Sequence, residues 1–257
     1  SCDNNASKEY YSFTDDLGNK ISLENKPNNI AVLFSSFVDI WNIAGGETSI
    51  TVGESIERGF VNDDVILVDK GAGKTINTEL LVAANPDLVI CSSDIEAQVK
   101  TAKILNDANI PSACFRVEKF EDYLNMLNIC TDITGNKEAY TEFGLNVKKE
   151  IDDIFENLST PVVKDILFIR AGSTSSSTKA KLASQHFVAD MLEELGTYNI
   201  ADDAKILLDG LSIEHILLAD PDYIFISTMG EEEASKENIE TLFASETYQA
   251  LTAVREK

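Results

Sequence analysis

A short segment occurs twice in the chain, and this internal repeat constrains the fold more than any other sequence feature. Residues 76–90 read INTELLVAANPDLVI, and residues 211–225 read LSIEHILLADPDYIF. Each copy predicts a short helix, a Pro-Asp turn and a buried strand. Two similar lobes, each containing one copy, are the simplest architecture for such a repeat. At a constant offset of 135 residues, the matched pairs are Glu79 with Glu214, Ala84 with Ala219, Pro86 with Pro221 and Asp87 with Asp222.

Strands and helices alternate around the first copy, which predicts an α/β fold with parallel sheets. A short hairpin is expected at the start, around the turn at residues 16–19. Apolar runs predict buried strands at 30–34, 65–68, 88–91 and 112–117, and helices are expected at 36–44, 77–84, 94–108 and 120–134. A new strand at 165–170 begins the second lobe.

One long helix interrupts this alternation. Between residues 137 and 158, apolar side chains recur every three or four positions and form a stripe that is expected to pack against the lobes. The stripe consists of Tyr140, Phe143, Val147, Ile151, Ile154 and Leu158. We therefore expect a flexible tether at 1–11, an N-terminal lobe at 12–136, a linking helix at 137–159 and a C-terminal lobe at 160–257.

Composition excludes several functional classes. The chain has 44 acidic against 21 basic residues, a net charge of −23, which disfavours nucleic acid and anionic lipid surfaces as partners. No apolar stretch approaches the roughly 18 residues of a membrane span. The two histidines, His186 and His215, have no metal-ligand spacing, and neither a nucleophile elbow nor a dinucleotide loop is present. The sequence thus indicates no catalytic residues, no metal site and no cofactor.

The four cysteines fall into two groups. Cys91, Cys114 and Cys130 lie in apolar runs and are expected to be buried free thiols, although a Cys91–Cys114 disulfide is geometrically conceivable. Cys2 is followed by a polar run, a pattern typical of a lipidated N-terminal cysteine on a flexible tether.

Candidate ligand-binding residues follow from the rule that open α/β sheets bind ligands at the carboxyl ends of their strands. Arg116 and Arg170 are the notable members, because arginine suits carboxylate, phosphate or catecholate oxygens, although ordinary salt bridges would also explain them. His186 follows a serine-rich stretch, and Arg58 lies in a loop that could border the site. The full set is Ser35, Ser36, Phe37, Arg58, Ser92, Ser93, Arg116, Arg170, His186, Thr228 and Met229.

Taken together, four segments resemble the substrate-binding proteins of ABC importers for iron–siderophore, haem and cobalamin, the class III periplasmic-binding-protein family. They are residues 14–33 (TDDLGNKISLENKPNNIAVL), 77–90, 191–202 (MLEELGTYNIAD) and 211–226. The likeness covers about residues 12–252 and depends on the joint order and spacing of the segments. It implies two α/β lobes joined by a rigid helix, with a ligand cleft between them.

The resemblance also implies a function. It indicates a monomeric receptor, not an enzyme, that captures a ferric siderophore or similar chelate outside the cell and delivers it to an ABC permease dimer. Lipid on Cys2 would hold the receptor at the outer face of the cytoplasmic membrane. Haem or cobalamin are alternative ligands, with His186 and Tyr198 as candidate haem contacts. An enzyme or chelatase on a similar two-lobed fold is a third, weaker reading.

Glu79 and Glu214 have two explanations. Each is expected in the first turn of a helix, where a carboxylate is stabilised by the helix dipole. The family resemblance adds that these two positions would form salt bridges to arginines of the permease dimer.

The C-terminal lobe departs from the family pattern. The family usually continues with a strand and a closing helix, whereas residues 227–257 are mostly helical in pattern. Either the chain is trimmed or the lobe is incomplete, and reduced stability of this lobe is expected.

Overall fold

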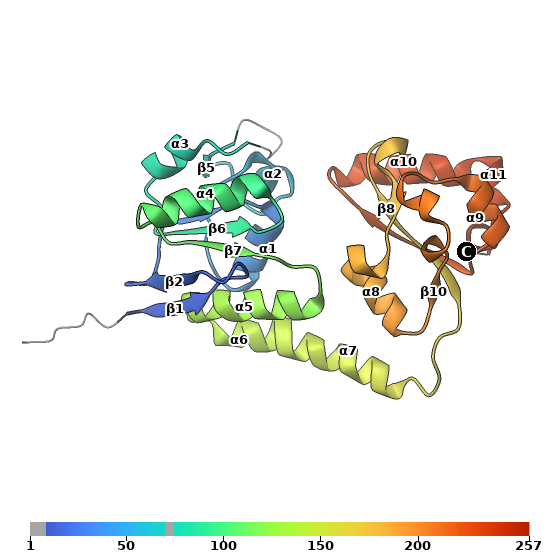
Figure 1. Cartoon of the computed structure of the whole chain (residues 1–257), viewed down its shortest axis with the longest axis horizontal. Coiled ribbons are helices and arrows are strands. Elements are labelled where there is room, and N and C mark those ends of the chain that lie inside the picture. The colour runs from blue at the N-terminus through green and yellow to red at the C-terminus, as the bar shows by residue number, and fades with distance from the viewer. Residues whose placement is uncertain (1–8, 70–74, 257) are drawn as a thin grey trace, which may run out of the picture. The chain divides into compact units, whose positions relative to one another are not determined.

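The strands of the first half form a five-stranded parallel sheet in the computed structural model, which describes residues 9–69 and 75–256 (Figure 1). The chain divides into two units, Ser1–Ile151 and Asp152–Lys257, here called the N-terminal and C-terminal lobes. Each is an α/β unit, as the repeat predicts. The strand order in the N-terminal lobe is β5-β4-β3-β6-β7. Its strands are β3 (Ile30–Val32), β4 (Ile50–Thr51), β5 (Ile66–Leu67), β6 (Leu88–Ser92) and β7 (Ser112–Phe115).

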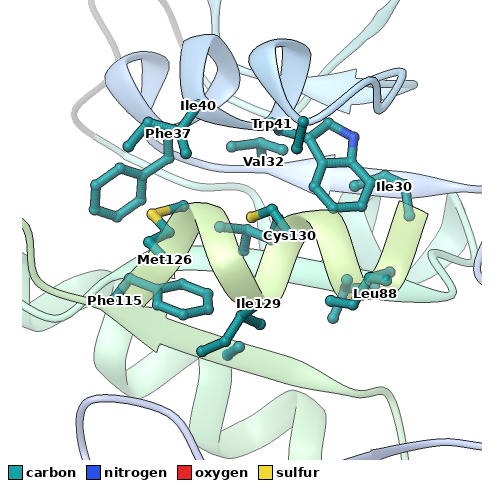
Figure 2. Close-up of a cluster of buried hydrophobic side chains, with 14 of the residues drawn as sticks. Ile30, Val32, Phe37, Ile40, Trp41, Leu88, Phe115, Met126, Ile129 and Cys130 are labelled. Atoms are coloured by element: carbon teal, nitrogen blue, oxygen red, sulfur yellow. The ribbon is translucent and has the colours of Figure 1, made fainter. Parts of the chain in front are cut away.

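Helices cover both faces of this sheet. They are α1 (Ser35–Ile43), α2 (Gly53–Glu57), α3 (Thr78–Ala83), α4 (Glu96–Asp107) and α5 (Phe120–Thr134). Ile30 and Val32 point into a core with α1 and α5 (Figure 2), whereas Ala31 and Leu33 point into a second core with residues of α3 and α4. Both faces of β3 are therefore buried, which explains its unbroken apolar sequence. Two elements, β4 and α2, were not predicted because they are too short to show a hydrophobic period.

Cys91, Cys114 and Cys130, the cysteines in the described part of this lobe, are buried free thiols, as expected. Cys91 and Cys114 are direct neighbours in the β6–β7 register, and they are not joined by a disulfide. A hydrogen bond from Cys114 and burial raise the pKa of the Cys91 thiol, and burial raises the pKa of Cys130 to about 12. The thiols of Cys91 and Cys130 are therefore protonated at neutral pH, and all three cysteines serve as small apolar core residues.

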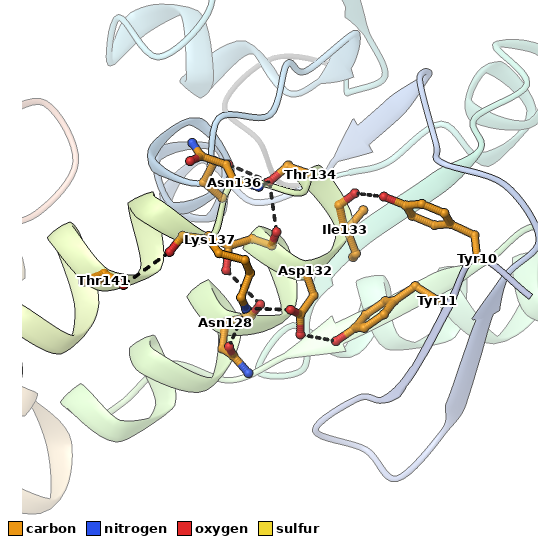
Figure 3. A network of polar contacts seen from close by, with 11 residues as sticks. Tyr10, Tyr11, Asn128, Asp132, Ile133, Thr134, Asn136, Lys137 and Thr141 are labelled. Carbon is orange, nitrogen blue, oxygen red and sulfur yellow. Dashed lines mark hydrogen bonds and ion pairs between the residues drawn. The ribbon is translucent and has the colours of Figure 1, made fainter.

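The N-terminal hairpin, β1 (Tyr11–Thr14) and β2 (Lys20–Leu23), is fixed to the lobe. Asp15 caps the turn by accepting from the Leu17 backbone N–H, and its second oxygen accepts from the Cys114 N–H at 3.0 Å. The Tyr10 hydroxyl donates to the Ile133 carbonyl at 2.7 Å, and the Tyr11 hydroxyl donates to Asp132 (Figure 3).

These bonds correct the predicted tether only at its end, because Tyr11 begins β1 and both tyrosines donate to α5. The polar run around them gave no sign of this, since the two tyrosines find their partners more than 120 residues away in the sequence. Residues 1–8 of the predicted tether lie outside the described residues.

The linking helix is regular at its ends and wide in the middle. It consists of α6 (Lys137–Tyr140), a π-helical turn (Thr141–Leu145) and α7 (Asn146–Asn157). A Cβ at Gly144 would lie only 3.1 Å from Leu124 Cδ2, so this glycine permits close contact with α5. The prediction that the whole apolar stripe is buried is wrong, because Phe143 is 42% exposed and Ile154 is 59% exposed. Only α6 and the π turn pack closely against α5, and no described side chain of α7 is buried.

The C-terminal lobe contains a smaller sheet in which β8 pairs with three other strands. Its strands are β8 (Asp165–Ala171), β9 (Lys179–Ala180), β10 (Tyr198–Asn199) and β11 (Tyr223–Thr228). β10 and β11 run parallel to β8, whereas β9 runs antiparallel. The helices are α8 (Phe187–Glu194), α9 (Ile213–Ala219), α10 (Glu232–Ala244), α11 (Glu246–Gln249) and α12 (Thr252–Arg255). The last three agree with the mostly helical pattern predicted for residues 227–257.

The two repeat copies play the same structural role. Asp87 accepts hydrogen bonds from the backbone N–H groups of Asn28 and Asn29, just before β3. Asp222 accepts in the same way from the N–H of Asp165, the first residue of β8. The matched aspartates therefore connect the start of the repeat strand to the start of β3 in one lobe and of β8 in the other, which explains why the Pro-Asp turn occurs twice.

Candidate functional site

Polar side chains gather where β3 gives way to α1 in the N-terminal lobe. The Arg58 guanidinium donates to the hydroxyls of Ser35 and Ser36 at 3.0 and 2.9 Å and lies over the ring of Phe60. Ser35 in turn donates to Glu54. Arg58 is exposed and held by neutral hydroxyls, so its remaining donors can reach an incoming acceptor. The structure thus brings together three of the predicted residues.

Phe37 lies elsewhere. Its ring is 3% exposed and packs in the core, against Phe34 in an edge-to-face contact. The prediction assigned it to the binding surface from its position after the strand. However, the chain enters α1 at Ser35, and the helical turn directs Phe37 inward.

Ser92 and Ser93 end β6 but are engaged within the lobe. Ser92 is buried and its hydroxyl accepts from the Asp94 N–H, while the Ser93 hydroxyl donates to the Phe115 carbonyl at 3.1 Å. The hydroxyl groups of both serines are therefore already engaged in hydrogen bonds at the end of β6.

Arg116 follows β7 and is neutralised by carboxylates. Its Nη2 lies 2.9 Å from Asp94 Oδ1, and Glu118 lies at 3.8 Å from Nε. Asp94 raises the pKa of Arg116. The sequence left open whether Arg116 forms an ordinary salt bridge, and the structure shows one with Asp94. This salt bridge reduces the positive potential that Arg116 can present to a ligand.

Arg170 has a different environment at the end of β8. Its Nε is buried and has no hydrogen-bond partner among the described residues. No ion pair joins its guanidinium to a carboxylate in the described part of the chain. An unpaired buried donor is unfavourable, so this group is suited to bind an oxyanion supplied from outside.

His186 is half-buried beside Arg170, at the start of α8. Its Nδ1 accepts from the Val188 backbone N–H at 3.2 Å, which leaves the proton of the neutral ring on Nε2. Nε2 lies 3.4 Å from the Ser227 hydroxyl, and the ring contacts Phe168 and Phe187. Burial and the charges of Arg170 and Lys181 lower the pKa of His186.

The last two predicted residues are Thr228, which ends β11, and Met229, which follows it. Thr228 is exposed, and Met229 donates its N–H to the Ala171 carbonyl while its side chain is 39% exposed. Both therefore lie at the same strand ends as Arg170.

Sequence reasoning missed Lys179 and Lys181. Lys179 is the register partner of Arg170 across β8 and β9, and Lys181 donates its N–H to the Phe168 carbonyl. The signal that could have found them was the alternation Lys179-Ala180-Lys181, which places both lysines on one face of a strand.

Glu79 and Glu214 are exposed residues in the first turns of α3 and α9, as predicted. Apolar side chains accompany both: Leu80 is 41% exposed beside Glu79, and Leu218 is 88% exposed on α9. A carboxylate next to exposed apolar surface occurs on both repeat copies.

Residues 9–69 and 75–256 contain no group of three or more His, Cys, Asp or Glu side chains that could hold a metal ion.

Comparison with models of known protein families shows the family to which the chain belongs. The model described as "Periplasmic binding protein" matches residues 30–257, nearly the whole chain. The chain belongs to the periplasmic binding protein family. Proteins of this family bind solutes outside the cytoplasmic membrane. A search of curated proteins found no matching sequence.

Solved structures of binding proteins share the fold. A periplasmic solute binding protein from Veillonella parvula has a TM-score of 0.71 at 18% identity, covering 96% of this chain and 76% of that one. The haem-binding protein HmuT has a TM-score of 0.64 at 19% identity, covering 95% and 79%. SirA of Staphylococcus aureus, solved with staphyloferrin B, has a TM-score of 0.61 at 18% identity, covering 96% and 87%.

Two features of this binding protein concern the membrane. Among its described residues, no helix has the length and apolar character of a membrane span. Cys2, the predicted site of lipid attachment, lies outside the described residues.

Proposed function

We propose that this chain is a receptor that captures a ferric siderophore or similar iron chelate outside the cytoplasmic membrane and delivers it to an ABC permease. The observation that carries the proposal is Arg170, a partly buried arginine at the carboxyl end of a parallel strand, with an unpaired donor. Chelates of this kind present oxygen atoms for which arginine is a suitable partner. The fold supports the reading, because solved proteins that share it include SirA with staphyloferrin B.

The proposed ligand contacts are different in the two lobes. In the N-terminal lobe they are Arg58 with Ser35 and Ser36, where the guanidinium is held in place by both hydroxyls. In the C-terminal lobe they are Arg170, His186, Thr228 and Met229. Ser92, Ser93 and Arg116 are secondary candidates, because their polar groups already have partners within the lobe.

The proposed permease contacts are Glu79 and Glu214. Their exposure, their equivalent places in the two repeat copies and the apolar side chains beside them fit a docking surface on each lobe. A permease dimer offers the same groups twice, so matched contacts on two similar lobes suit such a partner. The helix-dipole role of both glutamates is compatible with docking.

The receptor is proposed to act as a monomer held at the outer face of the cytoplasmic membrane by lipid on Cys2. The polar run after Cys2 supports this, because an anchored receptor needs a tether that leaves its lobes in water. The net charge of −23 further disfavours direct contact with anionic lipid.

Haem is a second candidate ligand, which His186 and the neighbouring Phe168 and Phe187 rings favour. Against axial ligation, Nδ1 of His186 is occupied as an acceptor, so the proton resides on Nε2. Coordination of iron by Nε2 would require the opposite tautomer and loss of the Val188 hydrogen bond. Tyr198, the other candidate, is exposed and its hydroxyl is hydrogen-bonded to Asp203.

Uptake by whole cells tests the transport role. Cells that lack this chain should lose uptake of radioactive iron supplied as one class of chelate, and restoring the chain should restore it. The panel should contain ferric hydroxamate, catecholate and carboxylate chelates, haem, and labelled cobalamin. Unchanged uptake of every compound after deletion would contradict the proposed function.

A further inference from the structure

Strand alternation gathers basic side chains on one face of the C-terminal sheet. Phe168 and Arg170 lie on the same face of β8, because alternate residues of a strand share a face. Lys179 is the cross-strand partner of Arg170, and Lys181 follows two positions later on the same face. On the other side, Ser227 of β11 is the partner of Arg170 and lies 3.4 Å from His186 Nε2. We call Arg170, Lys179, Lys181 and His186 the basic face.

The charges of this face are not neutralised within the described part of the chain. No ion pair there joins Arg170, Lys179 or Lys181 to a carboxylate, whereas Arg116, Lys164 and Lys236 each have an acidic partner. The contrast is informative because acidic residues outnumber basic ones 44 to 21. Surplus carboxylates are plentiful elsewhere on the chain, so a cationic surface without them indicates a place for an external anion.

Burial and mutual repulsion act on this face together. Its four residues are all half-buried. Burial, then Arg170 and Lys179, lower the pKa of Lys181, and burial, then Arg170 and Lys181, lower the pKa of His186. The groups are therefore close enough to repel one another. A bound anion would relieve this repulsion and would also satisfy the unpaired Nε of Arg170.

We propose that the basic face is an oxyanion site, and that the chelate captured by this receptor carries at least one carboxylate group there. This inference rests on the proposed receptor function and narrows its ligand class. The Arg170 guanidinium offers a planar fork to the two carboxylate oxygens, Lys179 and Lys181 add charge, and Nε2–H of His186 adds a neutral donor. Citrate-type ferric chelates and the propionates of haem share this chemistry, whereas a neutral trihydroxamate chelate and cobalamin do not.

Calorimetric titration of the whole chain with matched probes tests the site. The probes are ferric citrate, haem, haem with both propionates esterified, neutral ferrichrome, and cobalamin. The variants are Arg170→Gln and Lys181→Gln, and the control is Lys236→Gln, an exposed lysine of α10 paired with Glu232. Lys181→Gln keeps the test valid if Arg170→Gln does not fold.

We expect ferric citrate or haem to bind, and each variant of the basic face to weaken that binding about 10- to 150-fold. The Lys236 control should leave binding unchanged. Haem with esterified propionates should bind the parent chain weakly, with an affinity similar to that of unmodified haem for the variants of the basic face. Which of the two anionic probes binds identifies the source of the carboxylate. Tight ferrichrome or cobalamin binding that both variants leave intact would overturn the oxyanion site but keep the receptor function. Binding of none of these probes would overturn the oxyanion site, and the receptor function would then be decided by the wider uptake panel, which includes a catecholate chelate.

Discussion

Chelate uptake should collapse when Glu79 and Glu214 are both replaced by glutamine, while chelate affinity stays within about threefold of the parent. Both side chains are exposed on repeat helices and are absent from the strand ends where ligand contacts are proposed. Each lost charge-assisted contact should weaken binding to the permease about tenfold or more, so the double variant should lose at least about 100-fold. Uptake by cells and chelate titration of the purified chain measure the two effects separately.

The matched control is the double variant Glu96→Gln and Glu233→Gln. These glutamates also lie in the first turns of helices, one in each lobe, and are highly exposed. They therefore experience the same helix-dipole effect without belonging to the repeat. If the control reduces uptake as much as the Glu79 and Glu214 pair does, or if neither does, the docking role is wrong.

Replacing Gly46 by alanine should strongly destabilise the N-terminal lobe, although it adds only one methyl group. A Cβ at this position would lie 2.1 Å from Cε2 of Trp41. The indole cannot easily move, because it is buried in the core and its Nε1 donates to the Glu47 carbonyl at 3.0 Å (Figure 2). Overpacking of this kind costs about 1–3 kcal/mol of unfolding free energy, or more. We expect the melting temperature to fall by about 5–10 °C.

Trp41 is the only tryptophan in the chain, so its fluorescence reports thermal unfolding of this lobe. The control is Gly53→Ala, in the same lobe, where the nearest atom to a new Cβ is Asp69 Oδ2 at an ordinary 3.8 Å. A melting temperature for Gly46→Ala equal to that of the control would show that the turn beside Trp41 adapts, contrary to this account.

The sequence predicted the fold well where the signal was periodic or repeated. The match between Asp87 and Asp222 identified two similar lobes, and the structure shows that both aspartates connect strands in the same way. The apolar runs were recognisable because strands such as β3 and β6 are buried on both faces.

Other features depend on contacts that a single segment does not reveal. The burial expected of Ile154 assumed that the whole stripe has a packing partner, whereas only α6 and the π turn pack closely against α5. Tyr11 was read as part of a tether because its partner, Asp132, is remote in the sequence.

The candidate site was predictable only in part, for the same reason. The strand-end rule selected Ser35 and Ser36, and Arg58 was selected separately from a loop. The structure joins these three residues by hydrogen bonds. The rule failed for Phe37, since it says where the chain leaves a sheet and not which way the next side chain points. Lys181 was missed because its importance comes from its pairing beside β8.

Direct titration of the purified chain with iron chelates tests the central claim most simply. Each chelator should be compared in its ferric and metal-free forms, with binding followed by calorimetry. We expect one ferric chelate to bind saturably, one molecule per chain, with a dissociation constant of about 1 μM or tighter, and its metal-free form to bind more weakly. Absence of saturable binding across ferric hydroxamate, catecholate and carboxylate chelates, haem and cobalamin would contradict the account.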